Sequence, residues 1–246
     1  MSNVKVRVLG SGNAFNQNNR LNSSYLVESK EQKILIDCGF TTPLALQQND
    51  IPCNEIDAVL ITHYHGDHFA GLSAMLLALS YTSLQKKQLL IVGAEDVEDR
   101  VRELVKVLYP GSEKVFNTLD IKFQTITKSF KIGGISVEAI PMIHSVEALP
   151  YGFILDFNFK KIGFSGDTCW HAGVVDLITR VDAVFLECNL VKKVGKGHIS
   201  VEELEESKLV QSKKSNIYLT HLSGASYRLA EEKDYNCIAD ADTYTF

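Results

Sequence analysis

Short apolar runs, separated by polar and turn-forming segments, recur along the whole chain. The early runs mix apolar with polar positions, whereas other runs, such as 58–61, are entirely apolar. Alternation is typical of strands with one exposed face, and all-apolar runs are typical of strands covered on both faces. We predict strands at 4–9, 24–28, 33–37, 57–61, 89–93, 121–127, 135–141, 152–157, 161–165, 182–187 and 216–220.

Longer stretches with helix-like patterns lie between these strands. We predict helices at 41–49, 67–82, 95–108, 171–179 and 201–211. The stretch 67–82 is apolar almost all round, which favours a buried helix. Ser200 and Glu203 are three positions apart, as in a capping box, and place His198 just before the last of these helices. A chain of 246 residues is ample for one large α/β domain, so we expect a single domain over 1–246.

Composition narrows the class of protein. Hydrophobic residues make up 45% and charged residues 22%, which is ordinary for a globular protein. We expect no membrane association, because no apolar run reaches the roughly 18 residues of a span and the first residues lack a signal-peptide core. Five cysteines form no C-x-x-C pair, which favours reduced thiols and a cytoplasmic location.

The charge balance bears on the choice of partner. A net charge of −5 argues against a general nucleic-acid-binding surface, which would normally show a basic excess. Lys192, Lys193 and Lys196 could still give a phosphate-bearing substrate local counter-charge. They could equally be a solvated loop.

The window 62–71 carries the most informative chemistry of the chain. His63, His65, Asp67 and His68 fall within six positions, although the chain has only seven histidines. Residues two apart in an extended chain point the same way, so His63 and His65 can meet one metal, while Asp67 and His68 face a second. Zinc takes imidazole and carboxylate ligands, and two such ions about 3.5–4 Å apart form a hydrolytic centre.

Three further ligand-type side chains each close an apolar run. His144 follows 137–143, Asp167 follows 162–166, and His221 follows 216–220. Loop-forming residues come next in each case. Ligands at the tips of several strands are how a sheet scaffold builds a rigid site under loops.

These residues, in this order, resemble the metallo-β-lactamase superfamily over nearly the whole chain, from 8–14 to His221. The resemblance implies a four-layer αββα sandwich: two mixed sheets face to face, with helices outside. It also implies two metal sites that share Asp167. His63, His65 and His144 would hold one ion, Asp67, His68 and His221 the other, and Asp167 would bridge them.

Two later segments resemble the ribonuclease Z branch of this superfamily. Glu187 lies in 185–189 and His198 in the Gly-His-Ser segment of 195–200. In that branch the histidine is taken to protonate the leaving oxygen, while the glutamate orients the histidine. Asp67, Glu187 and His198 are the catalytic candidates of this chain. Asp37, by the same resemblance, would support a metal-bound histidine through its outer ring nitrogen.

The resemblance implies a hydrolase with two divalent metal ions, either zinc or, alternatively, manganese or iron. Our leading hypothesis is a phosphodiesterase acting on a nucleotide, a cyclic nucleotide or another small phosphodiester, with RNA as a further possible substrate and a homodimer expected from the family. The 23 positions from His144 to Asp167 are too few for the protruding arm of ribonuclease Z. The Pro-Arg-Tyr of that family is also absent after His221.

Several alternatives stay open at this point. The first is tRNA 3′-end processing, in which a partner subunit would replace the arm. The second is thioester or lactone hydrolysis, against which only Glu187 and His198 argue. The third is a non-catalytic, metal-binding regulatory protein.

Overall fold

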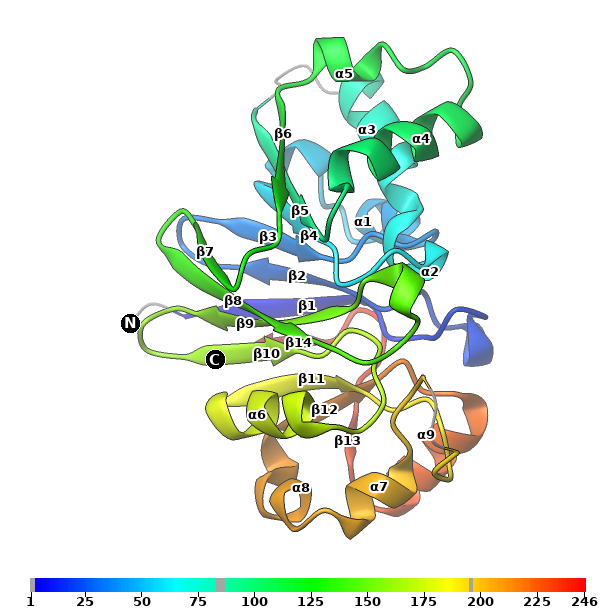
Figure 1. Cartoon of the computed structure of the whole chain (residues 1–246), viewed down its shortest axis with the longest axis vertical. Coiled ribbons are helices and arrows are strands. Elements are labelled where there is room, and N and C mark those ends of the chain that lie inside the picture. Colours follow the sequence, from blue (N-terminus) through cyan, green and yellow to red (C-terminus); the bar gives the residue numbers. More distant parts are fainter. Residues whose placement is uncertain (1–2, 83–86, 195–196) are drawn as a thin grey trace.

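Two sheets lie face to face, with helices on both outer sides, in a computed structural model that describes residues 3–82, 87–194 and 197–246 (Figure 1). The predicted four-layer α/β architecture is therefore confirmed. The first sheet has the order β14-β1-β2-β3-β4-β5-β6 and the second β13-β12-β11-β10-β9-β8-β7. The strands of the first sheet are β1 (Lys5–Gly10), β2 (Ser24–Glu28), β3 (Lys33–Ile36), β4 (Ala58–Leu60), β5 (Leu89–Gly93), β6 (Ile121–Thr125) and β14 (Thr243–Thr245).

The second sheet repeats the strand pattern of the first. Its strands are β7 (Ser129–Ile132), β8 (Ile135–Pro141), β9 (Tyr151–Asp156), β10 (Lys161–Phe164), β11 (Ala183–Glu187), β12 (Ile217–Thr220) and β13 (Asn236–Cys237). In each sheet three antiparallel pairs are followed by three parallel pairs: β14 to β3 and then β3 to β6 in one, β7 to β10 and then β10 to β13 in the other. Both sheets are mixed, as predicted.

Helices cover the outer face of each sheet. The first sheet carries α1 (Thr42–Gln48), α3 (Gly71–Thr82), α4 (Val97–Leu108) and α5 (Val115–Thr118), with α2 (Gly66–Phe69) leading into α3. The second carries α6 (Ala172–Arg180), α7 (Val201–Glu206), α8 (Lys208–Lys213) and α9 (Gly224–Glu232). The described residues also contain the 3₁₀ turns η1 (Gln17–Asn19), η2 (Cys53–Glu55), η3 (Val146–Ala148) and η4 (Lys214–Asn216).

Three apolar layers hold the sandwich together: one between the sheets and one between each sheet and its helices. In the middle layer Phe164 and Phe185 stack with ring centroids 5.2 Å apart, and Tyr25 packs against both rings. Such aromatic pairs contribute beyond the area that they bury. These packed rings lie beneath the loops that follow β10 and β11.

Two predicted helices are each divided in the structure. The stretch 67–82 forms α2 and α3, which are separated at Ala70. Beside this break Gly71 lies against the loop after β3, where a Cβ would stand 1.9 Å from the carbonyl oxygen of Gly39. The stretch 201–211 divides at Ser207, whose side chain accepts the Val210 N–H and caps a new helix. The elements β7, β13, β14, α5 and α9 were not predicted.

The predictions of reduced cysteines and of no membrane span can be compared with the structure. All five cysteines lie in the described residues and are free thiols. Within the ranges that the structure describes, no helix has the length and apolar character needed to cross a bilayer.

Candidate metal centre

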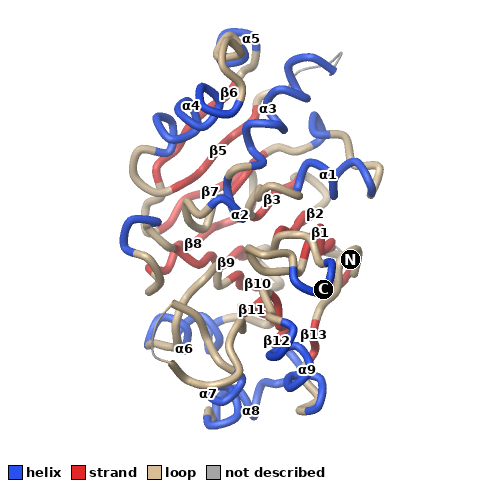
Figure 2. Tube along the Cα trace, turned by 90° about the vertical axis from the view of Figure 1, so that its right-hand side faces the viewer, coloured by secondary structure: helices blue, strands red, loops and turns tan. Residues whose placement is uncertain are grey.

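The candidate side chains lie at one end of the sandwich, on loops that leave the carboxyl ends of strands. Figure 2 faces this end and shows loops gathered between the two layers of helices. The window 63–68 follows β4, and the other three candidates follow three strands of the second sheet: His144 follows β8, Asp167 follows β10 and His221 follows β12. The fold therefore brings together all seven residues that the sequence nominated as ligands.

Three histidines form what we call the open cluster: His63, His65 and His144. Their ligand atoms all lie within 4.8 Å of one another, and His65 Nδ1 is 3.1 Å from His144 Nε2. His63 is buried, whereas His65 and His144 are half-buried. This cluster is thus reachable from solvent on one side.

Four residues form what we call the closed cluster: Asp67, His68, Asp167 and His221. All four are buried. His68 Nε2 lies 3.2 Å from Asp67 Oδ2 and 3.4 Å from Asp167 Oδ1, and His221 Nε2 lies 3.3 Å from an oxygen of each aspartate. Two imidazoles and two carboxylates therefore face a common point.

Asp167 lies between the two clusters. Besides its contacts in the closed cluster, its Oδ2 atom is 3.9 Å from His63 Nε2 and 4.0 Å from His144 Nε2. One carboxylate thus faces histidines of both clusters. This placement is the one that a ligand shared between two ions requires.

Unpartnered buried atoms test whether these residues fit a metal. His63 Nε2 and Asp167 Oδ1 are buried and have no hydrogen-bond partner among the described residues. An unpaired buried polar atom is costly and needs an explanation such as an ion. Imidazole nitrogens and carboxylate oxygens are the donors that borderline divalent cations take. The donor set therefore fits two such cations.

The surroundings shift the pKa values of two cluster histidines in opposite directions. Burial, reinforced by nearby His68, lowers the pKa of His63 well below its ordinary value. Burial would also lower the pKa of His68, but Asp167, Asp67 and Asp37 outweigh it and raise that pKa well above the ordinary value. Without a cation, His68 would therefore hold a proton among carboxylates, and metal binding would displace it.

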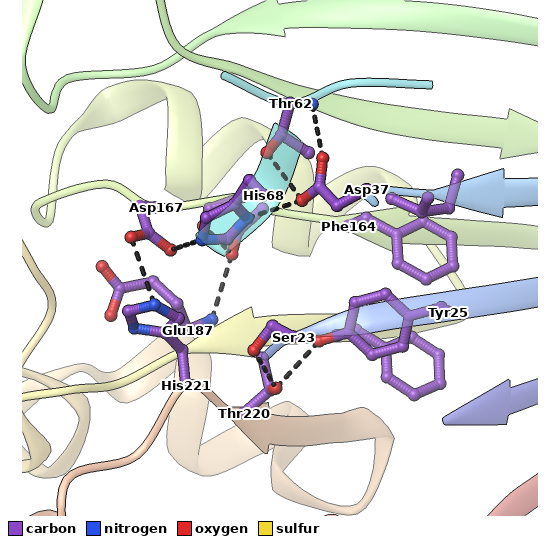
Figure 3. A pocket seen from close by; sticks show the side chains of 14 residues that line it. Ser23, Tyr25, Asp37, Thr62, His68, Phe164, Asp167, Glu187, Thr220 and His221 are labelled. Carbon is purple, nitrogen blue, oxygen red and sulfur yellow. Dashed lines mark hydrogen bonds and ion pairs between the residues drawn. The ribbon is translucent and has the colours of Figure 1, made fainter. Parts of the chain in front are cut away.

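Contacts behind the clusters fix the ring orientations. Asp37 Oδ2 lies 2.7 Å from His68 Nδ1, and the Thr62 N–H and hydroxyl donate to the two oxygens of Asp37 over 2.7 and 2.8 Å (Figure 3). Thr62 Oγ1 is also 3.1 Å from His63 Nδ1, and the carbonyl of Gly197 lies 2.6 Å from His144 Nδ1. Such contacts fix which ring nitrogen faces the metal.

Sequence reasoning identified Asp37 but missed Thr62 and Gly197. Thr62 directly precedes His63 at the end of a strand, and a hydroxyl at that position was the available signal. The role of Gly197 is carried by its backbone carbonyl, which no residue type reveals.

Two residues of the site adopt a left-handed backbone. Asp37 has φ = 61° and His221 has φ = 55°. Non-glycine residues in this region cost of order 1–3 kcal/mol and persist where the surrounding structure holds them. Their occurrence behind and within the closed cluster shows that the fold tolerates strain there to aim these side chains.

Glu187 and His198 form a pair beside the clusters. His198 Nδ1 lies 2.9 Å from Glu187 Oε1 and 3.9 Å from Asp167 Oδ2. Glu187 is buried and also accepts the N–H groups of Thr168 and Asn189 over 3.0 and 3.1 Å. Burial alone would lower the pKa of His198, but the hydrogen bond and charge of Glu187 raise it to about 9. The His198 side chain is 22% exposed, so a substrate could reach it.

The lysines near His198 contribute less than the sequence suggested. Lys192 is exposed, and Lys193 Nζ lies 3.9 Å from Glu203 Oε1 at the start of α7. Lys196 lies outside the described residues. The described lysines therefore show no convergence on the clusters.

This chain is similar to proteins of two named kinds. A family model described as "Anti-Pycsar protein Apyc1" matches residues 4–243. An Anti-Pycsar protein Apyc1 from Saccharibacillus brassicae is 28% identical over 206 residues, covering 82% of this chain and 83% of that protein. A ribonuclease Z from Clostridium acetobutylicum is 33% identical over 152 residues, covering 60% of this chain but only 48% of that protein.

The fold has a solved counterpart. The metallo-β-lactamase fold protein YhfI from Bacillus subtilis superposes with a TM-score of 0.80 at 21% identity, covering 100% of both chains. The predicted metallo-β-lactamase sandwich and the ribonuclease Z-like branch are confirmed, and the matches support a metal-dependent hydrolase. Because the family model spans nearly the whole sequence, the chain belongs to the Anti-Pycsar protein Apyc1 family.

Proposed function

We propose that this chain is a two-metal phosphodiesterase that hydrolyses a small nucleotide phosphodiester, with a nucleoside cyclic phosphate as the favoured substrate. The observation that carries the proposal is the pair of adjoining clusters that share Asp167, with the Glu187–His198 pair at their edge. Hydrolysis of a phosphodiester needs Lewis acidity at phosphorus and a proton for the leaving oxygen. The site offers residues for both.

The ligands divide between two cations as the clusters suggest. The open cluster would hold one ion through His63, His65 and His144, the closed cluster the other through Asp67, His68 and His221, and Asp167 would contact both. Bound there, divalent cations supply Lewis acidity toward a phosphoryl oxygen and acidify water. Zinc, manganese and iron all accept nitrogen and oxygen ligands, and zinc is our first expectation.

Residues of this chain would supply the proton that the leaving oxygen needs. Glu187 accepts from His198 Nδ1, which leaves Nε2 as the nitrogen that faces a substrate. His198 would donate a proton from Nε2 to the departing alkoxide oxygen, and Glu187 would hold the ring and favour its charged form. Asp67, the third catalytic candidate, would act as a ligand of the closed cluster, where its Oδ2 atom faces the same point as His221 Nε2.

The segment between His144 and Asp167 favours a small substrate over tRNA. It consists of η3, β9, a turn and β10, and both strands lie inside the second sheet. No residues are left there for a protruding arm. The ribonuclease Z proteins to which this chain is similar act on RNA by name, which supports phosphodiester chemistry, and the lack of room for an arm supports a small phosphodiester such as a nucleoside cyclic phosphate.

The decisive test is His198→Ala, assayed on cyclic nucleotides beside a thioester and a lactone. We expect two bound ions per chain, as in the parent, with turnover of the phosphodiester reduced by about 10²- to 10⁴-fold. His171→Ala is the matched control, because His171 caps α6 through Gly173 and belongs to neither cluster. Turnover of the acyl substrates alone by the parent protein would refute the phosphodiesterase.

A further inference from the structure

Two phenylalanine side chains project into solvent from loops beside the closed cluster. Phe40 is 62% exposed and Phe15 is 81% exposed. A single exposed apolar side chain is unremarkable on a protein surface. The position of these two rings relative to the metal ligands is what gives them meaning.

Phe40 lies against the turn that carries ligands of both clusters. A Cβ placed on Gly66 would be 2.5 Å from Cζ of the Phe40 ring, and Gly66 separates His65 from Asp67. The preceding Gly39 is equally close, since its Cβ would stand 1.8 Å from the carbonyl oxygen of Asp67. The ring is therefore held directly beside the open and the closed cluster.

The backbone on both sides of Phe40 is fixed. The Cys38 N–H donates to the carbonyl of His68 over 2.8 Å. On the other side the Asn22 N–H donates to Thr41 Oγ1 over 2.8 Å, and the Thr41 N–H returns a bond to Asn22 Oδ1 over 3.3 Å. An aromatic ring on so constrained a segment loses little conformational freedom when a ligand binds it.

Phe15 lies on the loop that borders the other side of the closed cluster. Asn13 Oδ1 accepts the Phe15 N–H over 3.2 Å, and Asn13 Nδ2 donates to Asn189 Oδ1 over 3.4 Å, two residues beyond Glu187. The same loop accepts the Gly224 N–H on Gln17 Oε1 over 3.2 Å, three residues beyond His221. The loops that carry Phe15 and Phe40 thus border one site, and Asn22 connects them through Asn13 and Thr41.

We propose that Phe40 is the platform on which the nucleobase of the substrate stacks, with Phe15 as a second, weaker aromatic contact. This inference rests on the proposed function and specifies how a nucleotide is held. In a nucleoside cyclic phosphate the ribose and phosphate rings are fused, so a phosphate at the clusters holds the base nearby, and the base turns only about its glycosidic bond. Stacking on an aromatic face accepts every base, because every base has a π-face.

The test is steady-state kinetics of the metal-loaded Phe40→Ala protein on cyclic UMP, cyclic AMP and 1,3-propanediol cyclic phosphate. The last substrate has the same six-membered phosphodiester ring but no base. We expect KM for both nucleotides to rise about 5- to 150-fold with kcat changed less than about threefold. Turnover of the base-free substrate and the metal content should not change. Phe15→Ala should show the same pattern with a smaller rise in KM.

Matched variants separate stacking from other roles of the ring. Phe159, 51% exposed on the turn between β9 and β10, is an exposed phenylalanine at the opposite end of the sandwich, so Phe159→Ala should match the parent. Phe40→Trp should retain nucleotide affinity, whereas Phe40→Leu should not. Affinity retained by the leucine variant would overturn stacking, because an apolar contact would then suffice.

The outcomes also distinguish this inference from the proposed function. If the parent protein hydrolyses no cyclic nucleotide, the proposed function fails and this inference with it. If the parent does so and Phe40→Ala keeps the same KM, the inference alone is overturned. An equal loss on the base-free substrate would likewise overturn it, by showing that Phe40 merely supports the ligand turn.

Discussion

The closed and open clusters share Asp167 but are held by the fold in different ways. Every member of the closed cluster is buried, and its His68 has the Asp37 carboxylate behind it at 2.7 Å. The open cluster has two half-buried members, and in the described part of the chain the ring of His65 hydrogen-bonds only to His144. One cluster is therefore enclosed by the protein, and the other is open to solvent on one side.

This difference allows one site to combine stability with access for a substrate. The closed cluster brings buried carboxylates and imidazoles together, and such groups are tolerated only when they are paired or bind a metal. The open cluster keeps a face toward solvent, which a substrate needs. We infer that the closed cluster contributes to folding as well as to metal binding, whereas the open cluster contributes mainly to binding and chemistry.

The largest effect should come from the residue that the two clusters share. Replacing Asp167 by alanine removes the carboxylate that faces both groups, so both ions should bind more weakly and phosphodiester turnover should fall on the order of 10³-fold. Metal content by mass spectrometry and turnover of a cyclic nucleotide measure the two losses. The control is Asp176→Ala, an exposed aspartate of α6 that pairs with Arg180.

Asp167→Ala is also the sharpest test of whether the clusters are one site. If the variant loses one ion and binds the other with the parent's affinity, the carboxylate serves a single cluster. The clusters would then be independent sites that happen to be neighbours.

A second prediction concerns stability in the absence of metal. His68→Ala leaves Asp37 buried without the imidazole that it contacts, so the free energy of unfolding should fall by about 3–5 kcal/mol. His65→Ala removes a half-buried ring of the open cluster and should cost less than about 1 kcal/mol. Urea denaturation of both variants after chelator treatment measures the difference, and equal losses would contradict the contrast between the clusters.

The sequence predicted the ligand positions better than their surroundings. Histidine and aspartate at strand ends are recognisable by type and spacing, so His63, His144 and His221 could be named before their distances were known. The contacts behind them depend on tertiary structure. The hydroxyl before His63 was the available signal for Thr62, but its two partners depend on the fold, and Gly197 acts through a carbonyl that no residue type reveals.

The same limit explains the errors in the elements. The strands β13 and β14 have two and three residues, and they exist because a sheet edge is available to pair with them. The division of 67–82 lies beside the close approach of Gly71 to Gly39, which is a contact across 32 positions of sequence. Single-domain organisation over 1–246, a homodimer and a cytoplasmic location stay predictions.

The smallest effect should follow from a change behind one cluster alone. Asp37→Asn keeps the shape of the side chain and can still accept the Thr62 N–H, but it withdraws the charge behind His68. A contact of this kind typically changes metal affinity by about 10- to 100-fold. We expect the larger loss at the closed cluster, since the open cluster contacts Asp37 only indirectly, through the Thr62 hydroxyl.

Stepwise zinc titration of the metal-free protein would resolve the two affinities. Asp57→Asn is the matched control, because Asp57 also accepts a backbone N–H, that of Lys33, but at the far end of β4. If Asp37→Asn weakened both steps equally, the charge of Asp37 would act on the whole centre and the two clusters would share their support as well as Asp167. A loss confined to one step would show that the fold tunes each metal separately, through a charge that never touches either ion.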